Sequence, residues 1–150
     1  MASAPNDSLG TVLGNLATAI TAEGFTAAPV LFSARKVPDT LANAGNVYAL
    51  AIDESRNVNY RGSDEMRLEH QVRASILYRF NIHDAVSSWE GFVDTYALKL
   101  VDALLDKGDD VADYDVTFVK ALYGTDTHGE RIAADLLFKV SHDFTIGSYL

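Results

Sequence analysis

The chain has 150 residues, of which 48% are hydrophobic and 22% are charged, and its net charge is −9. This length predicts one domain, residues 1–150, that is large enough to bury a real core. The acidic balance argues against a duplex-binding or membrane-surface protein, because phosphate contacts need clustered Lys and Arg. Cysteine is absent, which excludes disulfides, thiolate metal sites and cysteine nucleophiles and fits a reducing compartment.

The start of the chain lacks the features of an export signal. Residues 1–8 contain no basic region and no continuous apolar core, so we expect no secretory signal peptide. No apolar run approaches the roughly 20 residues that a membrane-spanning helix needs. We therefore expect a protein that is made and used without export.

Helical periodicity begins after residues 6–8, whose Asn, Asp and Ser side chains are good N-caps. Apolar residues then recur at three- and four-residue spacing and form one stripe: Leu9, Val12, Leu13, Leu16 and Ile20. Gly24 is the expected C-cap, because glycine adopts the left-handed conformation at little cost. The pattern predicts a first helix of about four turns.

Two strands are expected after this helix. The short apolar run 29–33 predicts a strand near a sheet edge, and residues 33–46 predict an irregular connection. Residues 47–53 predict a second strand that is apolar on both faces and therefore covered on both sides. The polar segment 54–66 is too long for a tight hairpin turn, so we expect it to form a protruding loop or an extended arm.

The most regular pattern in the chain runs from Arg67 to Phe80. Apolar and polar side chains alternate over this range with one exception, Leu77. Side chains of a strand point alternately to opposite faces, so the alternation predicts a long strand with one buried and one wetter face. Its length predicts a central position in an antiparallel sheet.

A second helix is expected after Asp84 or Ser87, where residues 87–90 match a capping box. Its apolar stripe is Trp89, Phe92, Val93, Tyr96, Leu100, Val101, Leu104 and Leu105, and it ends at Lys107 and Gly108. Residues 116–123 and 131–143 alternate as two further strands, with a turn at 124–129 between them, and the last strand could continue to Ile146.

The predicted order of elements is therefore α-β-β-β-α-β-β. It indicates an α+β fold in which two helices pack on one face of a β-sheet, which is either antiparallel or mixed.

No motif in the chain identifies a reaction. His70 and His142 fall on the apolar side of the two long strands and could meet across the sheet. They would form either a metal or acid–base pair or two ordinary hydrogen-bonded histidines, and no third metal ligand suggests itself. Asp126 and His128 could form a catalytic dyad, but Asp, Thr and Gly are also the residues that turns require.

Other chemical signals are equally weak. The acidic residues between 106 and 115 lack the spacing of a calcium-binding EF-hand. Gly10 and Gly14 follow no strand and so cannot form a phosphate-binding loop. We expect no catalytic residue, no metal, no cofactor and no enzymatic activity.

The polar segment and the polar face of the long strand carry the candidate functional residues. The segment contains both signs of charge, with Tyr60 between the possible anchors Arg56 and Arg61. The strand face is either simply solvated or a subunit interface crossed by salt bridges. The candidate interface residues are Arg56, Tyr60, Arg61, Asp64, Glu65, Arg67, Glu69 and Arg73.

Over most of the chain, this layout resembles the tail terminator (tail completion) proteins of long-tailed bacteriophages. The similarity begins with the amphipathic helix that ends at residues 23–25, the strand 47–53, and the polar segment before the long strand. It continues with the core helix that begins near Trp89 and the closing hairpin that contains residues 132–138.

The resemblance implies a structural α+β subunit, without catalytic residues, that assembles into a homohexameric ring. Such a ring caps the growing tail tube, ends tail polymerisation and presents a surface to the head–tail connector protein. The implied partners are copies of the chain, the tail tube protein and the connector, with no membrane and no sequence-specific nucleic acid. The implied location is the head-proximal end of the tail in the virion, and the host cytoplasm during assembly. A ring uses heterologous contacts, which the candidate residues would supply.

Two alternatives stay open. One is another phage neck or tail-tube ring component, which would polymerise into tubes or join the portal side. The other is a small α+β ligand-binding domain or enzyme with a pocket between sheet and helices. Trp89, Tyr96, Tyr78 and His70 would line that pocket, although the same residues otherwise form the core.

Overall fold

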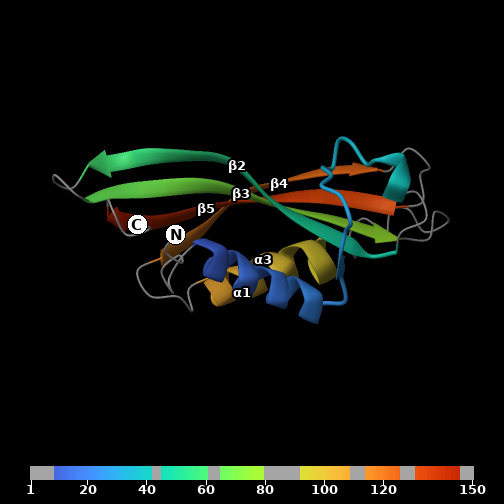
Figure 1. The fold of residues 1–150 in the computed structure, drawn as a ribbon. Helices are drawn as coiled ribbons and strands as arrows, with labels where there is room; N and C mark the ends of the chain where they lie inside the picture. The colour runs from blue at the N-terminus through green and yellow to red at the C-terminus, as the bar shows by residue number, and fades with distance from the viewer. Residues whose placement is uncertain are drawn as a thin grey trace.

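The computed structural model of the chain describes residues 9–41, 45–60, 65–79, 92–108, 114–125 and 131–145. These residues form two α-helices and a five-stranded mixed sheet with the strand order β1-β2-β3-β5-β4. The predicted α+β class is confirmed. Both helices lie against one side of the sheet, below it in Figure 1. We call this side the lower face and the opposite side the upper face.

The elements have the following bounds. The helices are α1 (Leu9–Ala22) and α3 (Leu98–Gly108), with a π-helical segment, η3 (Phe92–Ala97), before α3 and a 3₁₀ turn, η1 (Asp39–Leu41), before β2. The strands are β1 (Thr26–Ala27), β2 (Val47–Tyr60), β3 (Glu65–Arg79), β4 (Tyr114–Thr125) and β5 (Arg131–Thr145).

The first helix is confirmed. Its apolar stripe packs on the sheet, and Val12, Leu16 and Ile20 have no exposed surface. The helix ends as expected, because Gly24 adopts a left-handed φ of 95° and its N–H donates to the carbonyl oxygen of Thr21 at 3.1 Å. Glycine takes this conformation without the steric cost that a Cβ atom would impose.

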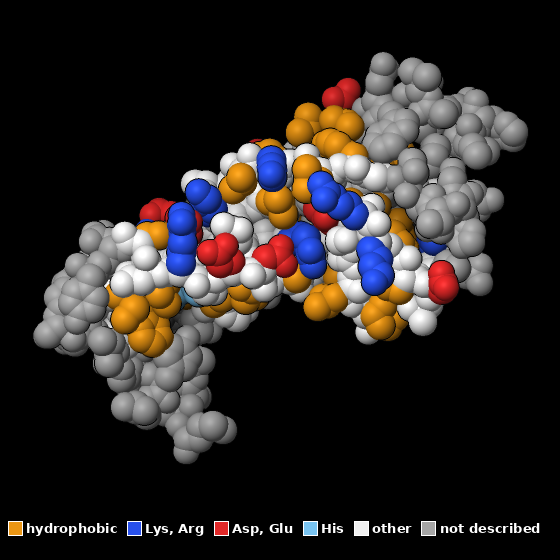
Figure 2. All heavy atoms as spheres, turned by 90° about the horizontal axis from the view of Figure 1, so that it is seen from above, with side chains coloured by type: hydrophobic (Ala, Val, Ile, Leu, Met, Phe, Trp, Pro, Cys, Tyr) orange, Lys and Arg blue, Asp and Glu red, His pale blue; other side chains and the backbone are white. Residues whose placement is uncertain are grey.

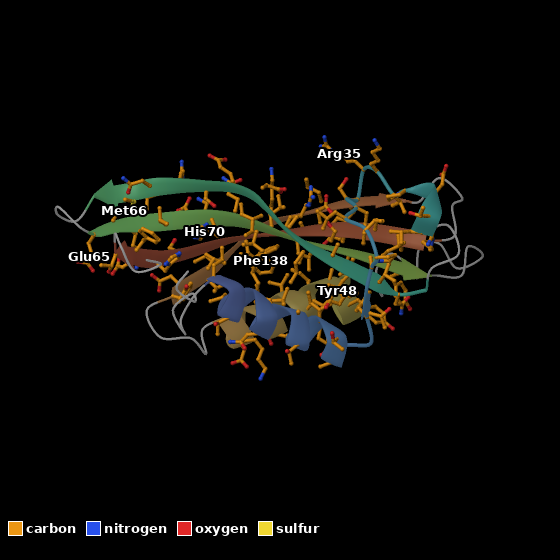
Figure 3. All side chains as sticks on the ribbon, in the orientation of Figure 1. Arg35, Tyr48, Glu65, Met66, His70 and Phe138 are labelled. Atoms are coloured by element: carbon orange, nitrogen blue, oxygen red, sulfur yellow. The ribbon has the colours of Figure 1, made fainter. Side chains whose placement is uncertain are left out.

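The long strand is also confirmed, and it lies at the centre of the sheet. β3 pairs with β5 along its whole described length, from Glu65 opposite Thr145 to Arg79 opposite Arg131, and with β2 on its other side. Its side chains Val72, Ala74 and Ile76 belong to the main core with the helices. In Figure 3, Tyr48 and Phe138 lie on the same side of the sheet as the helices.

The lower face and the two helices enclose the main core. In α3, Leu100 and Leu104 are fully buried and Val101 is nearly so, as the helical stripe predicted. They pack with Ile76 of β3 and Leu136 of β5, which have no exposed surface. The predicted cap and first turn of this helix, including Trp89, lie outside the described residues.

The prediction of an edge strand at residues 29–33 is wrong. The edge strand is instead the two-residue β1, which pairs in parallel with Val47 and Tyr48 of β2. Residues 28–41, which we call the crossing segment, contain one isolated bridge, between Ser33 and Lys36. Pro29 cannot donate to a strand ladder, and this segment serves instead as a cover for the upper face.

The crossing segment builds a second, smaller core on the upper face. Its side chains Phe32, Ala34 and Leu41 pack against Val47, Ala49, Leu77 and Ala133 of the sheet. Buried polar groups hold it in place: Arg131 donates to the carbonyl oxygen of Leu41, and Asp135 accepts from the N–H of Ala34 at 2.9 Å. Strand β2 is thus covered on both sides at its start, as its composition predicted.

The polar segment 54–66 is not a loop over most of its length. Residues 54–60 continue β2 and residues 65–66 begin β3, while residues 61–64 lie outside the described part of the chain. Register shifts between Ile52 and Glu54 and between Asn57 and Asn59 interrupt the alternation that would have indicated a strand. The segment is therefore an extended arm, which Figure 1 shows beyond the helices, with Glu65 and Met66 near its end in Figure 3.

Candidate functional site: a charged sheet face and a histidine pair

Charged side chains gather on the upper face of the sheet beyond the crossing segment. Four strands, β2, β3, β5 and β4, bring their upper-face positions together there because each points alternate residues to that side. We call this group the charged face: Asp53, Arg56, Arg67, Glu69, Arg73, Asp115, Lys139 and Asp143. Figure 2 looks onto this side of the molecule and shows basic and acidic side chains interspersed along it.

Ion pairs on this face join residues of different strands. Arg56 donates to Glu69 from Nε at 3.2 Å and from Nη2 at 2.9 Å, and Lys139 lies 4.0 Å from the same carboxylate. Arg67 pairs with Asp115 at 2.5 Å and with Asp143 at 3.2 Å. These pairs link β2, β3, β5 and β4 side by side, and each exposed pair contributes about 0–1 kcal/mol.

The structure brings together part of the predicted interface set. Arg56, Arg67, Glu69 and Arg73 share the charged face, whereas Glu65 lies at the end of the arm. Tyr60 ends β2, and Arg61 and Asp64 lie outside the described residues. Sequence analysis missed the partners Asp53, Asp115, Lys139 and Asp143, because only the register of the sheet shows that they lie opposite the predicted cations.

Two hollows open on the upper face. One, of about 240 Å³, is lined by Asp53 and Gln71 on one side and by Lys120 and Lys139 on the other. The second, of about 300 Å³, lies between the crossing segment and Arg73. Arg73 approaches Asp53 at 3.7 Å, and its Nε atom is buried without a hydrogen-bond partner. An unsatisfied buried donor costs about 1–3 kcal/mol, so the position of this atom is unfavourable within the subunit.

The two histidines that sequence analysis singled out do meet across the sheet. His70 of β3 and His142 of β5 are 6% and 8% exposed, and their Nε2 atoms lie 2.8 Å apart. The ring of Tyr114 stacks on His142 with centroids 4.8 Å apart. Ser55 of β2, which sequence analysis missed, places its hydroxyl 2.7 Å from His70 Nδ1.

Hydrogen-bond chemistry sets the direction of every proton in this chain of groups. The carbonyl oxygen of Asp143 can only accept, so His142 Nδ1, at 3.1 Å, donates to it. Neutral His142 then accepts at Nε2, and His70 donates to it through its own Nε2–H. Neutral His70 therefore accepts at Nδ1, and the hydroxyl of Ser55 donates to it.

The same environment favours the neutral form of His70. Burial, together with the charge that His142 can carry, lowers the pKa of His70 below its usual 6.5. Within the described residues, no group of three or more His, Asp or Glu side chains is placed to hold a metal ion. The observed geometry is that of a buried, hydrogen-bonded histidine pair that joins β3 and β5.

Three of the four residues that were expected to line a pocket between sheet and helices are described by the structure. Tyr78 and Tyr96 lie at the margin of the main core, with ring centroids 4.2 Å apart and ring planes tilted by 37°. Their mutual hydrogen bond, and then burial, raise the pKa of Tyr78 to about 12. His70 is eight positions from Tyr78 along β3, which is roughly 27 Å in a strand. Trp89 lies outside the described residues.

Several further sequence expectations concern residues that the structure does not describe. They include the Asp126 and His128 turn and the acidic residues 109–113. In the described part of the chain, no helix has the length and apolar character to cross a membrane. No known protein family matches the sequence, and no curated protein matches it either.

Proposed function

We propose that this protein is a ring-forming structural subunit of a bacteriophage tail, of the tail terminator kind. The observation that carries the proposal is the presence of two different open strand edges on opposite sides of one sheet. Among the described strands, β2 has no outer partner beyond Tyr48, and β4 has none on the opposite edge of the sheet. The layout of helices and strands that resembles the tail terminators supports the same function.

The two edges suit a head-to-tail contact between subunits. Each edge carries two exposed large hydrophobic side chains: Ile52 (44%) and Val58 (43%) on β2, and Val119 (47%) and Tyr123 (40%) on β4. Because the two surfaces differ, contact between the β2 edge of one subunit and the β4 edge of the next is heterologous. Repeated heterologous contacts close into a ring when the rotation between subunits allows it.

The charged face supplies polar contacts beside these edges. Its ion pairs are mostly satisfied within the subunit, so it adds orientation rather than large affinity. Arg73 is the exception, since its buried Nε atom has no hydrogen-bond partner and lies beside a hollow. The Arg73 side chain as a whole is 23% exposed, so its outer guanidinium nitrogens can donate to a carboxylate or carbonyl oxygen of the neighbouring subunit or of the tail tube.

The test uses two separate variants, each with one substitution on one of the two edges. We expect Ile52→Lys and Val119→Lys each to prevent ring formation by the purified protein, or its capture at the ends of purified tail tubes, as measured by light scattering and electron microscopy. Leu98→Lys is the matched control, because Leu98 is 49% exposed on α3, away from both edges.

A mixture of the two edge variants distinguishes head-to-tail contact from any other. Each variant keeps one intact edge, so the mixture should form dimers but no rings, whereas each variant alone should remain monomeric. Open tubes of wild-type protein would favour the tail-tube alternative. A wild-type monomer that ignores tail tubes in every condition, or edge variants that assemble like wild type, would contradict the proposal.

A further inference from the structure

We propose that Ser55 is an activated nucleophile that reacts with activated acyl and phosphonyl esters, with His70 as its general base and His142 as a positioning residue. All three residues belong to one subunit, but Ser55 lies between Ile52 and Val58 on the β2 edge, so the reaction is expected of subunits whose β2 edge is not covered by a neighbour. It rests on the hydrogen-bonded chain that runs from the exposed edge of β2 into the sheet.

The first step concerns the reacting group. Ser55 is exposed on an edge strand, so a substrate can reach its hydroxyl. The hydroxyl lies 2.7 Å from His70 Nδ1 and, by the proton assignment above, already directs its hydrogen at that lone pair. A nucleophile within hydrogen-bond reach of a base, with a third group orienting the base, is the arrangement that activates serine.

The second step concerns the base. His70 is only 6% exposed, and burial lowers its pKa below 6.5, so it is neutral and able to accept a proton at pH 7. When it accepts the Ser55 proton, both of its ring nitrogens become donors. Its Nε2–H keeps its acceptor, the Nε2 atom of His142, 2.8 Å away. The imidazolium is therefore accommodated without any rearrangement.

The third step concerns His142, which acts only through His70. Its own tautomer is fixed by the carbonyl oxygen of Asp143 at 3.1 Å, and its ring plane is held by the stacked ring of Tyr114. Without an acceptor at this position, His70 could move its proton to Nδ1 and lose the ability to take the Ser55 proton. Among the titratable groups, His142 contacts the base directly, and Tyr114 contacts His142 in turn.

The covalent step balances without any further reactant. The Oγ atom of Ser55 bonds to the carbonyl carbon of an activated ester, the bond to the alkoxide leaving group breaks, and the Ser55 proton passes through His70 to give the free alcohol. Water, deprotonated by His70, then attacks the acyl-serine, and the carboxylic acid leaves as Ser55 regains its proton. Alternate residues of the open β2 edge point N–H groups outward, where the developing oxyanion can bind.

The experiment uses the full chain in its unassembled, monomeric form and an alkyl fluorophosphonate probe, which transfers its phosphonyl group to Oγ with loss of fluoride and the Ser55 proton. Intact mass and peptide mapping should show one adduct, at Ser55. Ser55→Ala should abolish it, and the neighbouring Ser141→Ala, on the other face of the sheet, should leave it unchanged. His70→Gln should lower the labelling rate by about 10²-fold or more.

The role of His142 has its own readouts. His142→Gln keeps an acceptor for the His70 proton and should label faster than His142→Leu, which has none. In wild type the labelling rate should rise with pH through a midpoint below 6.5, and His142→Leu should move that midpoint. Circular dichroism checks that every variant is folded.

Three results would each overturn the inference. They are the absence of an adduct at Ser55, an adduct that forms equally fast in folded His70→Gln, and a wild-type labelling rate that does not change between pH 5 and pH 8. The last requires no substitution, so the inference remains testable even if a histidine variant fails to fold.

Discussion

Asp135 of β5 and Ala34 of the crossing segment, 101 positions apart in sequence, are joined by a buried hydrogen bond of 2.9 Å. The same carboxylate oxygen accepts the hydroxyl proton of Ser75 at 2.6 Å. Asp135 is 4% exposed, so bulk water does not compete for these bonds in the folded protein. One side chain therefore fixes the cover of the upper face to the two central strands.

Asp135→Ala should lower the free energy of unfolding by about 2–4 kcal/mol, because it leaves two buried donors without an acceptor. Urea denaturation measures the loss. Asp115→Ala is the matched control, since that side chain is 74% exposed and pairs with Arg67 at the surface; its cost should stay below about 1 kcal/mol. Equal losses of unfolding free energy in the two variants would show that the buried hydrogen bonds contribute no more than the surface ion pair.

Gly124→Ala and Gly14→Ala should change stability in opposite directions. A Cβ atom at Gly124 would lie 2.4 Å from the backbone oxygen of Ala34, and a backbone group cannot yield cheaply. We expect a loss of about 1–3 kcal/mol. At Gly14, within α1, an added Cβ meets nothing within 4 Å, so the same change should stabilise the helix by about 0.5–1 kcal/mol. Thermal unfolding of both variants tests the contrast.

Leu100→Ala and Leu98→Ala compare the two sides of α3. Leu100 is fully buried in the main core, and its truncation should cost about 2–5 kcal/mol through lost burial and a residual cavity. Leu98 is 49% exposed, and its truncation should cost less than about 1 kcal/mol. The midpoint of urea denaturation separates them, and a larger loss for Leu98 would contradict the packing of this helix.

The stability of the protein should fall as the pH drops below 6.5. The pKa of His70 is lowered in the folded state by burial and by His142, so below 6.5 the unfolded chain binds the proton first. Its contribution is fully present above pH 6.5 and is lost as the pH falls through 6.5 toward the folded pKa. Urea denaturation of wild type and His70→Gln across pH 5–8 measures the difference, which should narrow at low pH. If the difference in stability between wild type and His70→Gln stayed constant over this pH range, the prediction would be wrong.

The periodicity of hydrophobic residues alone was sufficient to predict the long helices and strands. The alternation from Arg67 onward predicted β3, and the helical stripes predicted α1 and α3, because each of these elements buries one face over many residues. β1 has only two residues, too few to show any period. The edge strand was therefore predicted at the more apolar run 29–33, which covers the sheet instead of joining it.

The histidine site shows why sequence alone could predict only part of it. His70 and His142 both fall on the apolar side of their strands, and this was enough to expect them near each other. Ser55 could not be found in this way, because β2 shifts register between Ile52, opposite Val72, and Glu54, opposite Gln71. That one-residue bulge turns Ser55 to the face of His70, and no sequence pattern marks it.

The strand order has a consequence for the synthesis of the chain. β5, residues 131–145, lies between β3 and β4, and in the described sheet these two strands touch only through it. Because β5 is synthesised after β3 and β4, β4 has no partner and one side of β3 is open until β5 emerges from the ribosome. During that interval these exposed edges must be kept from pairing with other chains.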